Sequence, residues 1–125
     1  IIGQLADKAG LAEGVMLLTP YVADSKEEKS AKFTAAYREK YGETPIQFAA
    51  DAYDAIYTIK AALEYAKVTD PTIDHSALSD ALTAAMTKIT VEGVTGTMTW
   101  DESGEPNKTP KAMVIQGGTY VSMDE

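Results

Sequence analysis

The chain has 125 residues, of which 45% are hydrophobic and 24% are charged, a composition typical of a folded globular protein. Nineteen acidic residues against eleven basic ones give a formal net charge of −8, which repels phosphate backbones and argues against a nucleic-acid partner. The absence of cysteine excludes disulfides, thiol catalysis and cysteine-ligated metal sites within these residues. The longest apolar runs fall far short of the ~20 residues that span a bilayer.

The first predicted elements are a short helix and a strand. Residues Leu5 to Ala9 have helical character, and Gly10 is placed to end that helix. The apolar run from Val15 to Leu18 lies between Gly14 and Pro20. A short run bounded in this way predicts a buried strand of a parallel or mixed sheet.

Two helices follow, each introduced by a predicted capping box. Ser25 to Glu28 fits one such box, and the helix after it carries an aromatic stripe before Gly42 ends it. Thr44 to Gln47 fits the second, with proline at the first helical position. The helix that it starts is expected to reach about Lys67. Because this helix is apolar around most of its circumference, we expect it to be buried between other elements.

The last third of the chain predicts one more helix and three strands. Asp74 is expected to cap a helix that runs to about Thr87. Val91 to Thr95 is predicted as a connector, and an acidic turn follows the next strand. Gly117-Gly118 is a two-residue hairpin signal. The strands are predicted at Gly96–Trp100, Lys111–Gln116 and Thr119–Met123.

The predicted order α-β-α-α-α-β-β-β holds too few strands for a self-contained α/β domain. We therefore expect the chain to be part of a larger α/β protein, with a helical middle at about 25–95. The segments 14–20 and 111–123 are expected to pair in one sheet, since each apolar strand needs a partner. Uncovered helix faces and strand edges associate, so the isolated chain is expected to form a swapped homo-oligomer or to be the remnant of a cleaved parent.

No pattern in the sequence predicts catalysis, a metal or a cofactor. His75 is the only histidine, and its place in the first turn of a predicted helix favours an exposed surface residue. Asp101, Glu102 and Glu105 surround Gly104, but they lack the alternating ligand spacing of a calcium loop and fit an ordinary acidic turn. No phosphate-binding loop, dinucleotide fingerprint or nucleophile elbow is present.

Asp51 and Asp54 lie three residues apart on the long predicted helix. Paired carboxylates can carry out acid–base chemistry. They can equally form the polar stripe of the helix, with Asp51 gaining from the helix dipole near the N-terminus. The structural alternative is favoured, and Asp51 is kept as a minor candidate for ligand binding.

Three stretches taken together carry a family resemblance. They are Ala12-Glu13-Gly14-Val15 leading into the first strand, Phe33-x3-Tyr37-x3-Tyr41-Gly42-x2-Pro45 with the following Ala50-x2-Tyr53-Asp54-Ala55, and Gly93-Val94-Thr95-Gly96-x3-Trp100-Asp101-x2-Gly104 with Lys111 to Tyr120. In this order and spacing, the chain resembles the C-terminal part of type I extracytoplasmic solute-binding proteins of ABC transporters. The most similar group is the branched-chain amino-acid receptors.

The resemblance implies an α/β fold of two lobes that close on a small ligand about a hinge. By similarity, residues 1–21 and 110–125 would belong to the second lobe and residues 22–109 to the first. The crossings would fall near 20–24 and 101–110. Family members are at least about twice as long, so this chain would carry a minority of the ligand pocket.

The resemblance also implies a function and candidate site residues. Phe48 matches the position of an aromatic residue that touches the apolar part of the ligand, although a core position remains an equal alternative. Gln47 is a weaker candidate, because the predicted capping box already gives its side chain a partner. The implied protein is not an enzyme. It captures a small amino acid outside the cytoplasmic membrane and passes it to a membrane permease. The alternatives are a fragment of an α/β enzyme, or a ligand-sensing regulatory domain of the same fold.

Overall fold

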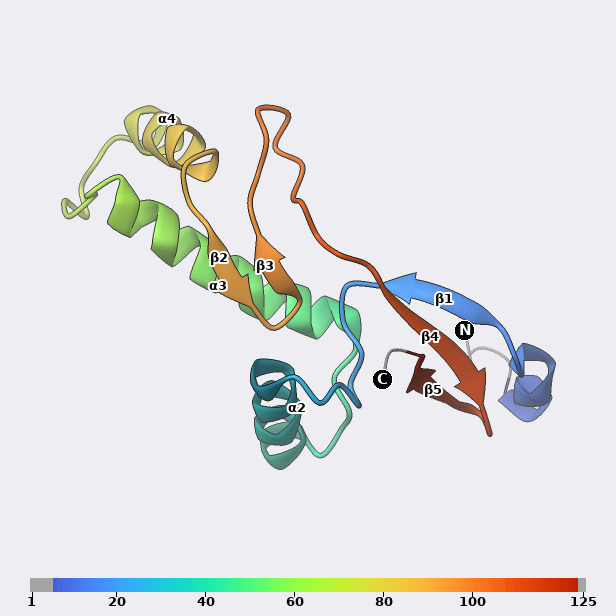
Figure 1. Ribbon diagram of the computed structural model, residues 1–125. Helices are drawn as coiled ribbons and strands as arrows, with labels where there is room; N and C mark the ends of the chain where they lie inside the picture. The colour runs from blue at the N-terminus through green and yellow to red at the C-terminus, as the bar shows by residue number, and fades with distance from the viewer. Residues whose placement is uncertain (1–5, 124–125) are drawn as a thin grey trace. The chain divides into compact units, whose positions relative to one another are not determined.

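The computed structural model describes residues 6–123, which divide into two compact units. The first unit comprises the described residues of 1–49 and 109–125, and the second comprises residues 50–108. Figure 1 shows the helices and strands of both. Their bounds are η1 Ala6–Ala12, β1 Met16–Thr19, α2 Glu28–Tyr41, α3 Gln47–Tyr65, α4 His75–Met86, β2 Val91–Gly93, β3 Gly96–Met98, β4 Lys111–Gln116 and β5 Thr119–Ser122.

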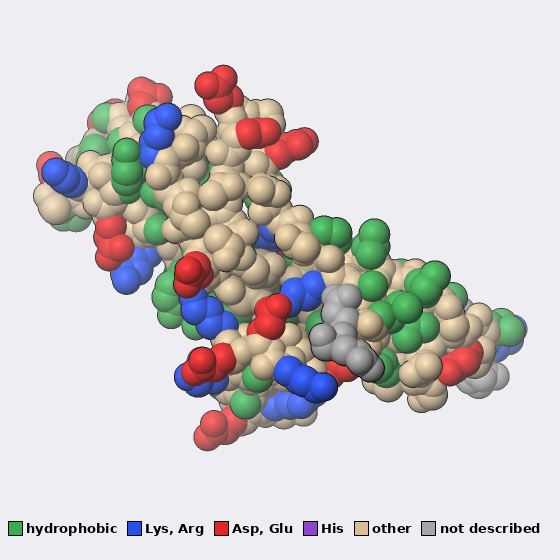
Figure 2. Space-filling view, in the orientation of Figure 1, with side chains coloured by type: hydrophobic (Ala, Val, Ile, Leu, Met, Phe, Trp, Pro, Cys, Tyr) green, Lys and Arg blue, Asp and Glu red, His purple; other side chains and the backbone are tan. Residues whose placement is uncertain are grey.

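The first unit contains a three-stranded antiparallel sheet in the order β1-β4-β5 (Figure 1). Leu17 lies opposite Met113 on β4, which confirms that segments 14–20 and 111–123 pair. The expectation of a buried strand in a parallel or mixed sheet is wrong. β1 alternates in exposure, with Met16 68% and Leu18 74% exposed, because successive side chains of a strand point to opposite faces and one face of this antiparallel sheet is uncovered in this chain. Figure 2 shows hydrophobic side chains gathered on the surface over this sheet.

The ends of this sheet are held by turns and by two carboxylates, one of which, Asp24, accepts from the N–H of Ser122 at 3.0 Å. Gly117 and Gly118 both have positive φ values, 59° and 72°, as the predicted two-residue hairpin requires. The Glu13 carboxylate accepts from the backbone N–H of Gly117 at 2.8 Å. The preceding helix differs from the prediction: η1 consists of 3₁₀ turns over Ala6–Ala12 with a kink at Lys8 (φ −101°, ψ 16°), and Leu5 lies outside the described residues.

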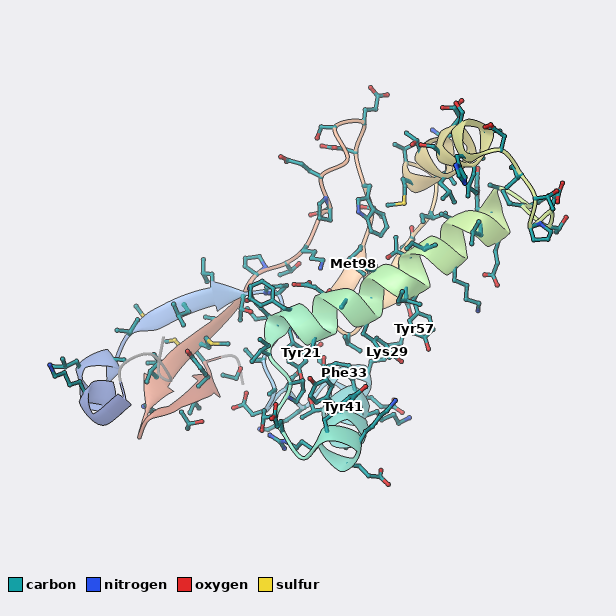
Figure 3. The ribbon with its side chains drawn as sticks, turned by 180° about the vertical axis from the view of Figure 1, so that it is seen from behind. Tyr21, Lys29, Phe33, Tyr41, Tyr57 and Met98 are labelled. Carbon is teal, nitrogen blue, oxygen red and sulfur yellow. The ribbon has the colours of Figure 1, made fainter. Side chains whose placement is uncertain are left out.

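Helix α2 lacks its predicted N-terminal capping box and packs against Tyr21 through the ring of Phe33. The capping box at Ser25 does not form, because the Ser25 hydroxyl accepts from the N–H of Glu27 and the helix begins only at Glu28. Gly42 ends the helix in the left-handed conformation, as predicted. Tyr21, which is 2% exposed, lies edge-on against Phe33 with the ring centroids 5.8 Å apart (Figure 3).

The core of the second unit forms between α3, α4 and a small hairpin. The hairpin pairs β2 with β3, so the prediction of a connector at Val91–Thr95 is wrong for its first three residues. The Asp74 carboxylate caps α4 by accepting from the N–H of Ser76, as predicted. The buried cluster consists of Ala62, Ala85, Ile89, Val91 and Met98.

Helix α3 buries a face of small and polar residues. Its buried positions are Ala50, Asp54, Thr58 and Ala62, spaced four residues apart. Its large apolar side chains are exposed in this chain, among them Ile56 (66%) and Ile59 (50%). The prediction that this helix is covered on most of its circumference is therefore wrong for residues 6–123. None of the helices in this range is long and apolar enough to cross a membrane.

We expect Lys67→Gly to raise the free energy of unfolding by about 1 kcal/mol. Lys67 has φ 54° and is the only non-glycine residue with positive φ among those described. It ends α3 in a Schellman motif, in which the N–H of Val68 donates to the carbonyl of Leu63 at 3.1 Å. A left-handed residue with a Cβ costs about 1–2 kcal/mol, which glycine avoids. Urea denaturation measures the change. Lys60→Gly, inside the same helix, is the control and should lower stability by about 1 kcal/mol.

We expect the stability of the protein to fall above pH 10, with Tyr21 as one cause. Burial raises the pKa of the Tyr21 hydroxyl above its ordinary value of 10.0, although the hydrogen bond with Thr34 and the charge of Arg38 partly lower it. The unfolded chain releases this proton near pH 10 while the folded chain keeps it. The stabilising contribution is therefore complete below pH 10 and is lost as the pH rises through the raised pKa.

Denaturation of wild type and Tyr21→Phe at pH 7 and at pH 10.5 measures this effect. The Tyr21→Phe protein should lose less stability between the two pH values, because it lacks the hydroxyl that titrates. The other tyrosines are common to both proteins and contribute equally. An equal loss in the two proteins would contradict the assignment.

Candidate functional site

The first turn of α3 exposes an aromatic side chain that no core contact explains. α3 follows the buried Pro45 and begins at Gln47. Phe48 is 68% exposed, so within this chain it is not a core residue. A large apolar side chain at the start of a helix, next to a half-buried amide, can supply an apolar contact and a polar contact from one turn.

The side chain of Gln47 is bound to β1. Thr19 Oγ1 lies 2.7 Å from Gln47 Oε1 and donates to it. The predicted capping box at Thr44 is wrong, because Thr44 Oγ1 accepts instead from the guanidinium of Arg38 at 3.2 Å. Gln47 is therefore engaged by a residue 28 positions earlier in the chain, and its amide nitrogen is the group left to meet another molecule.

Asp51 forms an ion pair within the second unit. Its Oδ1 lies 2.8 Å from Nζ of Lys108, and the two side chains are 36% and 22% exposed. A partly buried pair of this kind is screened less than a surface pair. A positively charged ligand group would have to share Asp51 with Lys108. The carboxylate is thus available only in part.

Asp54 has a structural role and is not brought together with Asp51 in one acidic site. Its Oδ1 accepts from the N–H of Val94 at 2.8 Å, and its Oδ2 accepts from the N–H and the hydroxyl of Thr95 at 2.9 and 2.6 Å. Asp54 is 2% exposed. Both carboxylate oxygens are occupied by the turn between β2 and β3, so the structural alternative describes this residue.

The remaining acidic and histidine candidates lie on the surface. His75 is exposed at the start of α4. Asp101 binds its own turn, and hydrogen bonds from the Ser103 hydroxyl and then from the backbone of Glu105 and Ser103 lower the pKa of its carboxyl. Over residues 6–123, no group of three or more histidine, aspartate and glutamate side chains could hold a metal ion.

An apolar groove also runs along the C-terminal half of α3. It is lined by side chains that include Ile56, Ile59 and Leu63, with Lys60 and Lys67 beside them. The sequence-predicted residues do not line it. The groove is therefore a separate surface from the first turn of α3.

Sequence reasoning missed the partners of the candidate residues. Thr19, Lys108 and Thr95 are the side chains that engage Gln47, Asp51 and Asp54. Their partners lie 28, 57 and 41 residues away, so no local pattern connects them. The weak signal for Thr19 is its place at the end of an apolar strand, where a hydroxyl near the core must find a hydrogen-bond partner.

Comparison with known proteins gives a family and a fold. A family model described as periplasmic binding protein matches residues 2–119. A structure from Rhodospirillum rubrum, provisionally named a branched-chain amino acid ABC transporter, is 29% identical over 98% of this chain and 34% of its own, with a TM-score of 0.68. No curated protein matches the chain.

Two further structures show the same fold at lower identity. A solute-binding protein of an ABC transporter from R. palustris, in complex with benzoate, is 20% identical over 97% of this chain and 32% of its own, with a TM-score of 0.76. A leucine-binding protein from Thermotoga maritima is 22% identical over 97% and 33%, with a TM-score of 0.76. The chain therefore spans about one third of the length of these structures.

Proposed function

The chain belongs to the periplasmic binding protein family, and we propose that it is part of the solute-binding component of an ABC transporter that captures a branched-chain amino acid. The observation that carries the proposal is the exposed ring of Phe48 on the first turn of α3, within a chain that the family model matches over residues 2–119. The Rhodospirillum rubrum relative supports the ligand class by its name. Such a component works outside the cytoplasmic membrane and delivers its ligand to a membrane permease.

In this proposal, Phe48 contacts the apolar side chain of the ligand, while Gln47 and Asp51 are candidates for its polar groups. One aromatic ring can contribute about 1–2 kcal/mol through the area that it covers. Micromolar affinity needs about 8 kcal/mol. The donors and acceptors for the ammonium and carboxylate of an amino acid must therefore come mainly from a longer protein in which this chain lies.

We further propose that residues 1–21 and 110–125 belong to one lobe of that protein and residues 22–109 to the other. The pairing of β1 with β4 supports the first grouping, because it joins the two ends of the chain in one sheet. The crossings would then lie near 20–24 and 101–110. Both segments contain proline, which restricts the backbone on either side of a hinge.

Calorimetry on the longer protein and on the 125-residue chain tests the proposal. We expect the longer protein to bind leucine, isoleucine or valine with micromolar affinity, and the 125-residue chain to show no measurable binding. Phe48→Ala in the longer protein should weaken leucine binding about five- to thirtyfold, which corresponds to the contact of one ring. Tyr65→Ala is the matched control, because Tyr65 is an aromatic residue of the same helix with similar exposure, 55%.

Three results would contradict the proposal. Micromolar binding by the 125-residue chain would show that the polar groups of the pocket lie within it. An unchanged affinity in Phe48→Ala would remove Phe48 from the ligand contact. Binding of benzoate, but of none of the three amino acids, would assign the protein to a different ligand class.

A further inference from the structure

We propose that Thr19 is a positioning residue for ligand binding, which holds the first turn of α3 so that the ring of Phe48 meets the ligand. The inference rests on the proposed function, in which Phe48 contacts the apolar part of the ligand. It adds a residue that does not touch the ligand itself. Thr19 acts through Gln47, the neighbour of Phe48.

The hydroxyl of Thr19 has polar neighbours from two residues, Gln47 and Tyr21. It lies 2.7 Å from Oε1 of Gln47 and 3.0 Å from the carbonyl oxygen of Tyr21, and it accepts from the N–H of Tyr21 at 3.3 Å. Thr19 is 5% exposed. The hydroxyl has a single proton to donate, and of its two acceptors the oxygen of Gln47 is the nearer, at 2.7 Å against 3.0 Å for the carbonyl of Tyr21. Its β-branched side chain also has restricted rotation about χ1.

The position of Phe48 depends on the turn that Thr19 holds. The backbone of the first turn of a helix is held by fewer hydrogen bonds than the helix interior, because its N–H groups have no intrahelical acceptors. Gln47 is the first residue of α3 and Phe48 is the second. Since Phe48 is 68% exposed, packing does little to fix its ring, and the direction of its side chain follows the backbone of this turn. The bond from Thr19 to Gln47 therefore sets where the ring lies.

Thr19 is connected to helix α2 through Tyr21. Tyr21 is joined to Thr19 through its backbone, and its hydroxyl shares a hydrogen bond with Thr34 Oγ1. Its ring packs at 82° against Phe33, beside it in Figure 3. Thr34 in turn donates to the carbonyl of Ser30 at 2.9 Å. Hydrogen bonds thus link the end of β1 to α2 and to the start of α3, next to the proposed crossing near 20–24.

Calorimetry with leucine and alanine on the longer protein tests this role. Thr19→Val removes the hydroxyl with little change in shape, and we expect it to weaken leucine binding about five- to tenfold, the value of one lost hydrogen bond. Alanine, whose single methyl group offers the ring far less apolar area than leucine does, should lose less than about twofold. Thr19→Ser keeps the hydroxyl and should bind leucine within about twofold of wild type. In a Phe48→Ala background, Thr19→Val should add less than about twofold.

The outcomes separate this proposal from the one on which it rests. If Phe48→Ala weakens leucine binding and Thr19→Val does not, only the positioning role of Thr19 is wrong. If Thr19→Val weakens leucine and alanine equally, and does so also in the Phe48→Ala background, Thr19 supports the fold and does not position Phe48. If Phe48→Ala has no effect, the proposed ligand contact itself fails. Unfolding midpoints of all variants identify any loss of affinity that comes from partial unfolding.

Discussion

Three hydrogen-bond donors converge on the carboxylate of Asp54, and the second unit depends on them. The N–H groups of Val94 and Thr95 and the Thr95 hydroxyl all point at this side chain. The turn comes so close that a Cβ on Gly93 would collide with the carboxylate. A buried carboxylate is stable only when its oxygens are bonded. The hairpin of β2 and β3 is thereby attached to α3, and Met98 is brought into the core with Ala62.

This interaction also explains why α3 buries an unusual face. A helix that must present Asp54 to the hairpin also turns Ala50, Thr58 and Ala62 inward, because these positions follow each other at intervals of four. The small side chains let the hairpin and α4 approach closely. The large apolar residues then lie on the outer face, where Ile56 and Ile59 are exposed in this chain. Such a surface has the composition of an interface within a larger protein.

The parts of the fold that depend on local chemistry could be predicted from the sequence. Asp74 caps α4, Gly42 ends α2 and Gly117-Gly118 turns the last hairpin, because each needs only neighbouring residues. Both predicted capping boxes are wrong, for different reasons: the Ser25 hydroxyl accepts from the nearby N–H of Glu27, whereas Gln47 has a tertiary partner in Thr19. β2 was missed because three residues including a glycine carry no alternating pattern, and its place is set by Asp54 from 40 residues away. The candidate site shows the same limit of local patterns. Phe48 is indicated by a family resemblance, whereas the contact of Thr19 with Gln47, 28 residues away, is visible only in the structure.

Amide hydrogen exchange of Val94 and Thr95 tests most directly whether the Asp54 carboxylate holds the second unit. In wild type, both amides should be protected to nearly the same extent as the core of this unit. In Asp54→Ala, both should lose that protection, and the free energy of unfolding should fall by about 3 kcal/mol, the cost of leaving buried donors unsatisfied. Asp54→Asn, which keeps one acceptor oxygen, should protect one amide and not the other. Unchanged slow exchange of both amides in Asp54→Ala would contradict this account, because the hairpin would then be held by its other contacts.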